Sequence, residues 1–140
     1  ATLQNNNLQK AESSLIKYFE ARPNDNRGCL ALGLTFAAQT EKIEQAREQL
    51  QKCLQINPNN FEAAYQLGLS YKTVGDSAKA LGFFEKTVKL SPNYAAALRD
   101  LGTAYLQTGQ EVKARPALEK AVSLNPKDAD AHFQLSRLYN

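Results

Sequence analysis

Apolar residues recur along this chain every three or four positions, in segments that are separated by short polar stretches. Between residues 61 and 94, for example, Ala64, Leu67 and Tyr71 share one helical face, and Ala80 and Phe84 share another. This spacing indicates amphipathic α-helices. The pattern therefore predicts an all-α protein built from pairs of helices.

The same pattern returns with a period of 34 or 35 residues. The pair Leu67 and Gly68 recurs 34 residues later as Leu101 and Gly102 and 35 residues earlier as Leu32 and Gly33. An alanine and a proline keep the same period; they are Ala11, Ala46, Ala80 and Ala114, and Pro23, Pro58, Pro92 and Pro126. Three independent markers with one period indicate an internal helix–turn–helix repeat.

The period divides the chain into three nearly complete repeats flanked by two partial ones. By register, the chain starts in the second helix of one repeat and ends in the first helix of another. The expected segments are 7–25, 26–60, 61–94, 95–128 and 129–140. The 26–60 repeat is 35 residues long, and we expect its extra residue in the turn between its helices, where an insertion costs least.

Local signals predict where individual helices start and stop. Asn7 is expected to cap the first helix, because its side-chain oxygen can accept a free first-turn N–H. Gly75 is expected in the left-handed conformation at a helix end, with Asp76 capping the next helix. Pro116 lies inside an expected helix, where it removes an N–H, and this predicts a bend or a delayed helix start.

The order of the markers, Leu-Gly, Tyr, Ala-x-x-x-Phe and Pro, resembles the tetratricopeptide repeat family along nearly the whole chain. The resemblance implies a right-handed superhelical array of antiparallel helix pairs, an α-solenoid, in which each unit packs on its neighbours. Gly68 and Gly102 are then expected where the paired helices come closest, opposite Ala80 and Ala114. The resemblance also implies a concave groove that is lined by the first helices and binds a peptide or another protein.

Helical periodicity assigns to this groove the face of each first helix that turns away from its own partner helix. The expected partner-binding residues are Arg27, Leu30, Leu34, Glu62, Tyr65, Gln66, Leu69, Lys72, Arg99, Asp100, Thr103, Phe133 and Arg137. Aromatic residues and arginines in this set are the types that dominate binding energy at interfaces. The alternative interpretation is that each is an ordinary surface residue.

One specialised partner of the family is not expected here. Family members that bind the acidic C-terminal tails of heat-shock chaperones clamp the carboxylates with Lys, Asn and Arg. The corresponding positions of this chain are Leu30, Leu34, Gln66, Ala96 and Asp100. None of them matches, and Asp100 would repel a carboxylate.

Composition and charge argue against nucleic acid and against a membrane span. The net charge is only +3, and the basic residues are interleaved with acids instead of forming one run, which favours a solvated mixed face. No apolar run approaches the roughly 20 residues that a membrane span needs. The near-consensus repeats favour a bacterial source, and a cytoplasmic location is the working interpretation.

The sequence predicts no catalytic, cofactor or metal site. His132 is the only histidine, and no Ser or Cys can be matched to it by spacing. Glycine-rich phosphate loops and metal-ligand clusters are absent from the sequence. Cys29 and Cys53 fall on opposite helices of one pair; we expect buried free thiols in preference to a disulfide.

Three functions remain compatible with these features. The first is a non-enzymatic scaffold that binds a peptide or protein partner in the concave groove. The second is self-assembly through the half repeats at the two ends, which would give a homo-oligomer. The third is a docking segment of a larger enzyme.

Overall fold

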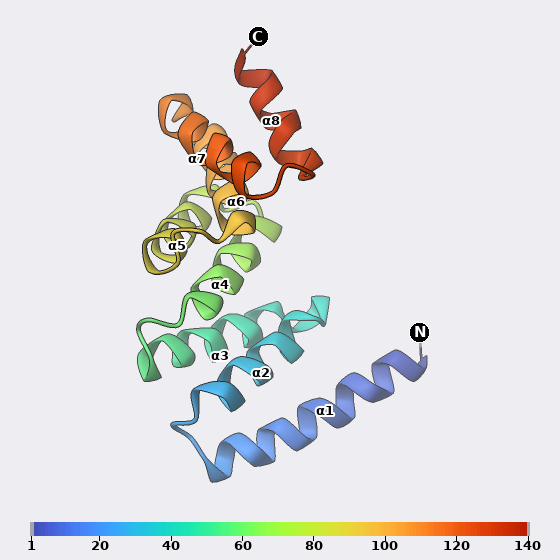
Figure 1. Cartoon of the computed structure of the whole chain (residues 1–140). Helices are drawn as coiled ribbons and strands as arrows, with labels where there is room; N and C mark the ends of the chain where they lie inside the picture. The colour runs from blue at the N-terminus through green and yellow to red at the C-terminus, as the bar shows by residue number, and fades with distance from the viewer. Residues whose placement is uncertain (1, 140) are drawn as a thin grey trace. The chain divides into compact units, whose positions relative to one another are not determined.

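The computed structural model describes residues 2–139, and in that range all regular structure is helical, with no strand (Figure 1). The predicted all-α fold is therefore confirmed. The helices are α1 (Thr2–Ala21), α2 (Asn26–Ala37), the short 3-10 helix η1 (Thr40–Lys42), α3 (Ile43–Ile56), α4 (Phe61–Thr73), α5 (Ser77–Leu90), α6 (Ala95–Gln107), α7 (Glu111–Leu124) and α8 (Ala129–Tyr139). The chain forms two compact units, Ala1–Ser70 and Tyr71–Asn140, which are described separately below.

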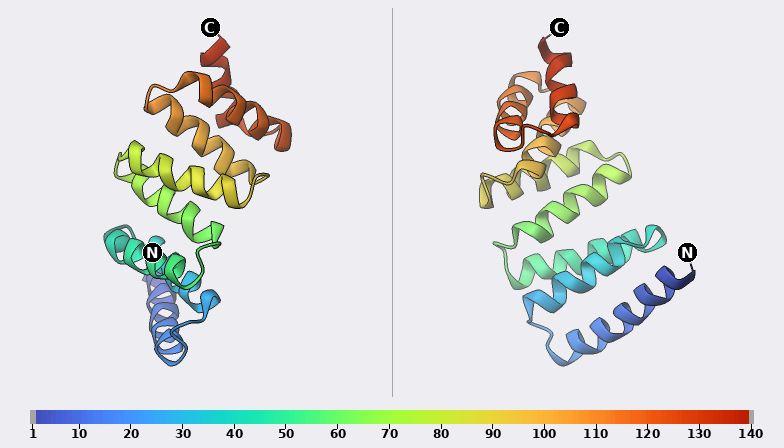
Figure 2. Two further views of the ribbon diagram at one scale, coloured as in Figure 1. Left: turned by 90° about the vertical axis from the view of Figure 1, so that its left-hand side faces the viewer. Right: turned by 45° about the vertical axis from the view of Figure 1, so that its right-hand side comes forward.

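Unit 1 is built on the helix pair α2 and α3, which run side by side in opposite directions (Figure 2). Leu32 and Phe36 of α2 pack with Ala46 of α3 in a core that Ile16 and Phe19 of α1 extend. The helices approach closely because Gly33 has no side chain: a Cβ there would lie 2.7 Å from Leu50 Cδ2. The periodic apolar residues therefore form the core.

The start of α1 differs from the expectation. The helix begins at Thr2, and Asn7 lies inside it, so the predicted cap at Asn7 is wrong. The polar run that precedes Asn7 contains no Gly or Pro to stop a helix. Further along, Leu15 and Phe19 fix α1 on α2.

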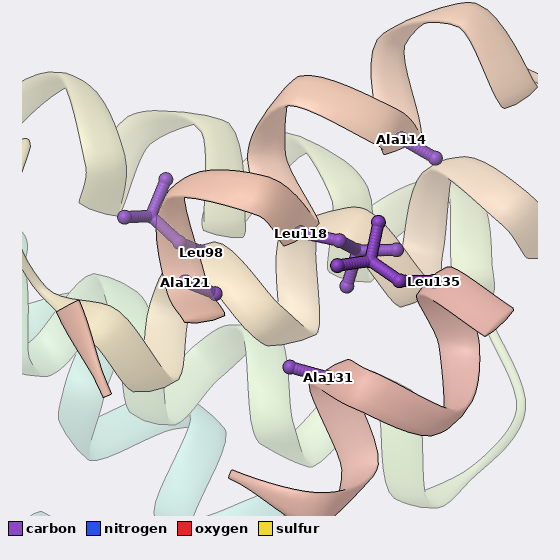
Figure 3. Packing of buried hydrophobic residues seen from close by; sticks show 6 residues of the cluster. All are labelled: Leu98, Ala114, Leu118, Ala121, Ala131 and Leu135. Carbon is purple, nitrogen blue, oxygen red and sulfur yellow. The ribbon is translucent and has the colours of Figure 1, made fainter. Parts of the chain in front are cut away.

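Unit 2 contains α5 to α8 and the last turn of α4. Its core cluster comprises Leu98, Ala114, Leu118, Ala121, Ala131 and Leu135, and Leu118 of α7 points toward Leu135 of α8 (Figure 3). The turns follow the sequence signals: Gly75 has a φ of 81°, and Asp76 Oδ1 accepts a hydrogen bond from Lys79 N at 3.1 Å. Both of these local predictions are confirmed.

Pro116 does not delay the start of its helix. Helix α7 begins at Glu111 and continues through Pro116 to Leu124, so the prediction of a delayed helix start is wrong. Because Pro116 has no N–H, the carbonyl of Val112 loses its intrahelical donor. Val112 is 90% exposed, and water can satisfy that carbonyl.

The two cysteines are joined, which corrects the expectation of free thiols. Cys29 of α2 and Cys53 of α3 form a disulfide, with their Cα atoms 5.6 Å apart. Both residues are fully buried, as expected. The sequence placed them on opposite helices of one pair but could not show that their side chains face each other at bonding distance.

Candidate partner-binding surface

The first helices α2, α4 and α8 begin at residues whose side chains accept a first-turn N–H. Asp25 accepts from Arg27 N at 3.0 Å, Asn60 from Ala63 N at 3.0 Å, and Asp128 from Ala131 N at 3.1 Å. These caps satisfy free N–H groups and fix where each helix starts. The positions of the side chains on the following turns are thereby set.

The Asp25 cap is reinforced by a side chain of α1. The Tyr18 hydroxyl donates to Asp25 Oδ2 at 2.5 Å. This hydrogen bond and the one from Arg27 N lower the pKa of the Asp25 carboxyl below its ordinary value. The same contact raises the pKa of the Tyr18 hydroxyl. Asp25 is therefore held as the anion that suits a helix N-terminus.

In unit 1 the predicted residues differ in how much surface they offer. Arg27, Leu34 and Glu62 are exposed, and Leu30, Gln66 and Leu69 are half-buried. Tyr65 is only 7% exposed, which differs from the expectation that its ring lines the groove. Its burial leaves little of the ring for a partner to touch.

The starts of α2 and α4 are joined directly. Asn60 Nδ2 donates to Asn26 Oδ1 at 2.9 Å, across 34 residues of sequence. This bond brings together the N-terminal ends of two first helices. Asn60 itself is 7% exposed, so this hydrogen bond supports the positions of α2 and α4 and is not available to a partner.

Four charged residues of unit 2 form a chain of alternating sign. Lys72 Nζ lies 3.2 Å from Asp100 Oδ1, Arg99 Nε lies 3.3 Å from the same oxygen, and Arg99 Nη1 lies 3.3 Å from Asp128 Oδ2. The Asp100 side chain is 1% exposed, whereas that of Lys72 is 44% exposed. Two cations therefore share two carboxylates.

This network changes the role of Asp100. The sequence placed Asp100 on the groove surface, but its burial withdraws it from a partner. Buried carboxylates need a compensating charge, which Lys72 and Arg99 supply. Arg99 in turn reaches the capping residue of α8. Arg99 and Asp100 thus tie α6 to the start of α8.

Two exposed residues of the predicted set in unit 2 lie on α8. Phe133 is 62% exposed, and Arg137, one turn later on the same helix, is also exposed. Among residues 2–139, no ion pair of Arg137 is formed. We call Phe133 and Arg137 the α8 patch. Thr103, the neighbouring candidate on α6, is half-buried and donates its hydroxyl proton to Arg99 O at 3.1 Å.

A second exposed apolar area lies at the α7–α8 edge, and the part of it that the sequence did not predict is Val112 of α7. A cavity of about 350 Å³ is lined by Glu111, Val112, Arg115 and Leu138. Nearby, Tyr139 is 60% exposed, and its hydroxyl donates to Glu119 at 2.9 Å. The sequence does contain a sign that Val112 is exposed, because its position does not fall on the helical face of Ala114, Leu118 and Ala121, the core positions of α7.

Neither a metal-ligand cluster nor a helix that could cross a membrane occurs among the described residues. Residues 2–139 hold no group of three or more His, Cys, Asp or Glu side chains that could bind a metal ion. His132 Nε2 lies 2.7 Å from the carbonyl oxygen of Pro126, at an exposed site. In the described part of the chain, no helix is long and apolar enough to cross a membrane.

Comparison with protein families identifies two matching segments. A tetratricopeptide repeat model matches residues 73–132, and a TPR repeat model matches residues 37–75. No curated protein sequence matches the chain significantly.

Solved structures share the fold along nearly the whole chain. A crystal structure of MamA is 26% identical with a TM-score of 0.87, covering 97% of this chain and 79% of that chain. A MamA RS-1 double mutant is 27% identical with a TM-score of 0.86, covering 97% and 76%. TTC0263, a thermophilic TPR protein of Thermus thermophilus, is 22% identical with a TM-score of 0.74, covering 98% and 75%; at that identity it supports the fold alone.

Proposed function

This chain belongs to the tetratricopeptide repeat family, and from this premise we propose that it is a non-catalytic scaffold whose α8 patch binds a peptide segment of a partner protein. The segment carries an apolar side chain that packs on Phe133 and a carboxylate that pairs with Arg137. Family membership supports protein interaction in general. The assignment to the α8 patch rests on the geometry of unit 2.

The observation that carries the proposal is the pairing of the other groove cations of unit 2. Lys72 and Arg99 already pair with Asp100 and Asp128, so a partner carboxylate would have to compete with buried acceptors. Arg137 has no such competitor among the described residues. An exposed aromatic ring one turn from an uncompensated arginine combines two residue types that are enriched at protein interfaces.

In unit 1 two of the apolar candidates lie together on α2. Leu34 is 39% exposed, and Leu30 beside it on α2 is half-buried. We assign them a weaker role, because scattered exposed apolar residues are common on any soluble protein. Arg27 and Glu62 at the starts of their helices would contribute mainly to the rate of association.

A peptide library displayed against the full chain tests the proposal. We expect selected peptides to be enriched in an apolar residue close to Asp or Glu. Phe133→Ala and Arg137→Glu should each weaken binding of such a peptide by tenfold or more, which is the effect typical of an interface anchor. Both residues are exposed, so stability should change by no more than about 0.5 kcal/mol.

Matched control variants come from the exposed side of α7. The apolar control is Leu124, which is 43% exposed. The basic control is Lys120, which is also exposed. Leu124→Ala and Lys120→Glu should leave peptide affinity unchanged. Equal losses in control and patch variants, or no loss at Phe133 and Arg137, would show that the α8 patch is not the binding site.

Self-assembly is the second candidate function, and the α7–α8 edge favours it. Val112, which lines a cavity of about 350 Å³, and Tyr139 are both exposed, and a second copy of the chain could cover them. Light scattering over a concentration range tests this candidate. Self-assembly predicts that the apparent mass of the wild-type protein rises with concentration and that the Val112→Glu variant stays monomeric. A wild-type protein that is monomeric at every concentration would exclude self-assembly.

A further inference from the structure

We infer that the disulfide between Cys29 and Cys53 is a reversible redox clamp on the α2/α3 helix pair, and that the pair stays folded when the clamp is reduced. The bond joins the two helices of a single pair, with a sequence separation of 24 residues. Both cysteines are fully buried. The clamp therefore acts on the opening of this pair, and its existence does not depend on the proposed binding function.

The helix pair of unit 2 shows that this geometry needs no covalent bond. The repeat places Leu98 of α6 where α2 has Cys29, and Ala121 of α7 where α3 has Cys53. Leu98 is 3% exposed and Ala121 is fully buried, both in one core cluster. Apolar packing alone therefore closes the equivalent pair.

The reduced pair would keep its own apolar contacts. Leu32 and Phe36 of α2 pack in the unit 1 core, and Gly33 lies against Leu50 of α3. None of these contacts involves a cysteine. Reduction should therefore loosen the pair without unfolding it.

The surroundings of Cys29 suit a thiol as well as a disulfide. Cys29 Sγ lies 3.6 Å from the carbonyl oxygen of Gln49 and 3.3 Å from Gln49 Nε2. A thiol formed by reduction would have that carbonyl as its acceptor, and its sulfur would keep the amide donor. Reduction therefore leaves no unpaired polar group at Cys29, which removes a common cost of burying one.

The proposed reductant is a dithiol. One of its thiolates attacks a cystine sulfur, the protein S–S bond breaks, and a mixed disulfide forms. The second thiolate of the reductant then displaces the protein sulfur. In balance, the protein gains two electrons and two protons, and the dithiol becomes a cyclic disulfide. Since both sulfurs are buried, the attack requires the pair to open locally.

The clamp controls the helix that carries the unit 1 surface candidates. Arg27, Leu30 and Leu34 all lie on α2, which the disulfide holds against α3. Loop-closure entropy for a loop of this size favours the closed pair by about 300-fold. Unit 2 contains no cysteine, so its helices should not respond.

Hydrogen exchange on the full chain, read by peptide, tests the clamp. Dithiothreitol should speed amide exchange in α2 and α3 by up to about 300-fold and leave α6 and α7 unchanged. Glutathione disulfide should restore the protection. The double variant Cys29→Leu, Cys53→Ala copies the Leu98 and Ala121 pair. It should fold with native helix content and show no response to dithiothreitol.

Each contrary result overturns the inference. If reduced wild-type protein unfolds while the double variant also fails to fold, the bond is a structural requirement and not a clamp. If amide exchange in α2 and α3 is the same before and after complete reduction, the disulfide does not restrain the opening of the helix pair. If glutathione disulfide does not restore the bond, the device is not reversible.

Discussion

Gly102 of α6 lies directly against Leu118 of α7. A Cβ on Gly102 would be 2.4 Å from Leu118 Cγ and 2.7 Å from Leu118 Cδ2, closer than real Cβ atoms come. Leu118 is fully buried in the unit 2 core, and the atom nearest to that Cβ is its branching carbon Cγ and not the end of the side chain. The repeated glycine is therefore required by a leucine on the partner helix, whereas the sequence analysis placed Ala114 opposite it.

Gly102→Ala should destabilise the protein by about 1–3 kcal/mol, the usual cost of overpacking a core. Gly82 of α5 is the matched control, because a Cβ there meets nothing within 4 Å. Gly82→Ala should raise stability by up to about 1 kcal/mol through helix propensity. Urea unfolding of both variants measures the two effects, and a shift of the same sign for both contradicts the packing argument.

Removing the buried Asp100 side chain should cost more stability than removing Lys72, one of the two cations that pair with it. Asp100→Ala leaves Lys72 and Arg99 without their shared acceptor and should cost about 2 kcal/mol. Lys72→Met should cost less than about 1 kcal/mol, because the Lys72 side chain is 44% exposed and screened by water. Denaturant titration separates the two. Equal costs would mean that Asp100 is not the centre of the network.

Pro116→Ala should stabilise α7. Alanine supplies the N–H that the Val112 carbonyl lacks, and Pro116 itself is exposed, so little packing is lost. The gain should be about 1–3 kcal/mol, measured as a rise in the urea midpoint at constant slope. An unchanged or lower midpoint would show that the proline contributes contacts that offset the hydrogen bond.

The stability of unit 1 should fall in acid because of Glu12. Lys42 Nζ lies 2.6 Å from Glu12 Oε2, and Gln39 Nε2 lies 2.9 Å from the same oxygen. The hydrogen bond from Lys42, followed by that from Gln39, lowers the pKa of Glu12 below its ordinary value of 4.5. The ionised form is thus favoured in the folded state. Its contribution is complete above the ordinary pKa and is lost as the pH falls through the lowered one.

Glu12→Gln tests this pH dependence. The difference in unfolding free energy between wild type and Glu12→Gln should be largest at neutral pH and should shrink below pH 4.5. Glu41→Gln is the control, since Glu41 is exposed and forms no ion pair among the described residues. A difference for Glu12→Gln that stays constant with pH would contradict the assigned ion pair.

The repeating parts of this fold were readable from the sequence because the same physical requirement recurs. Leu32 and Leu101 are both buried in first helices, and Gly33 and Gly102 both lie against a leucine of the partner helix. Each such requirement leaves the same residue type at the same interval. The family and the all-α class follow from these positions, while the repeat boundaries drawn from the sequence stay predictions.

The parts that sequence missed depend on single contacts that do not recur. Helical periodicity placed Tyr65 and Asp100 on an outer face, but it carries no information on what covers that face. The pairing of Cys29 with Cys53 occurs in one helix pair only, and so does the exposure of Val112. Such features need the distances between particular side chains, which spacing does not supply.

The central claim is that a partner segment binds at Phe133 and Arg137. Backbone amide chemical shifts of the full chain, titrated with a peptide that carries an apolar residue beside Asp or Glu, test it most directly. We predict that the largest shifts fall on α8 around Phe133 and Arg137 and are lost in Arg137→Glu. Shifts concentrated on the exposed residues of α5 and α7, with α8 unaffected, would contradict the account.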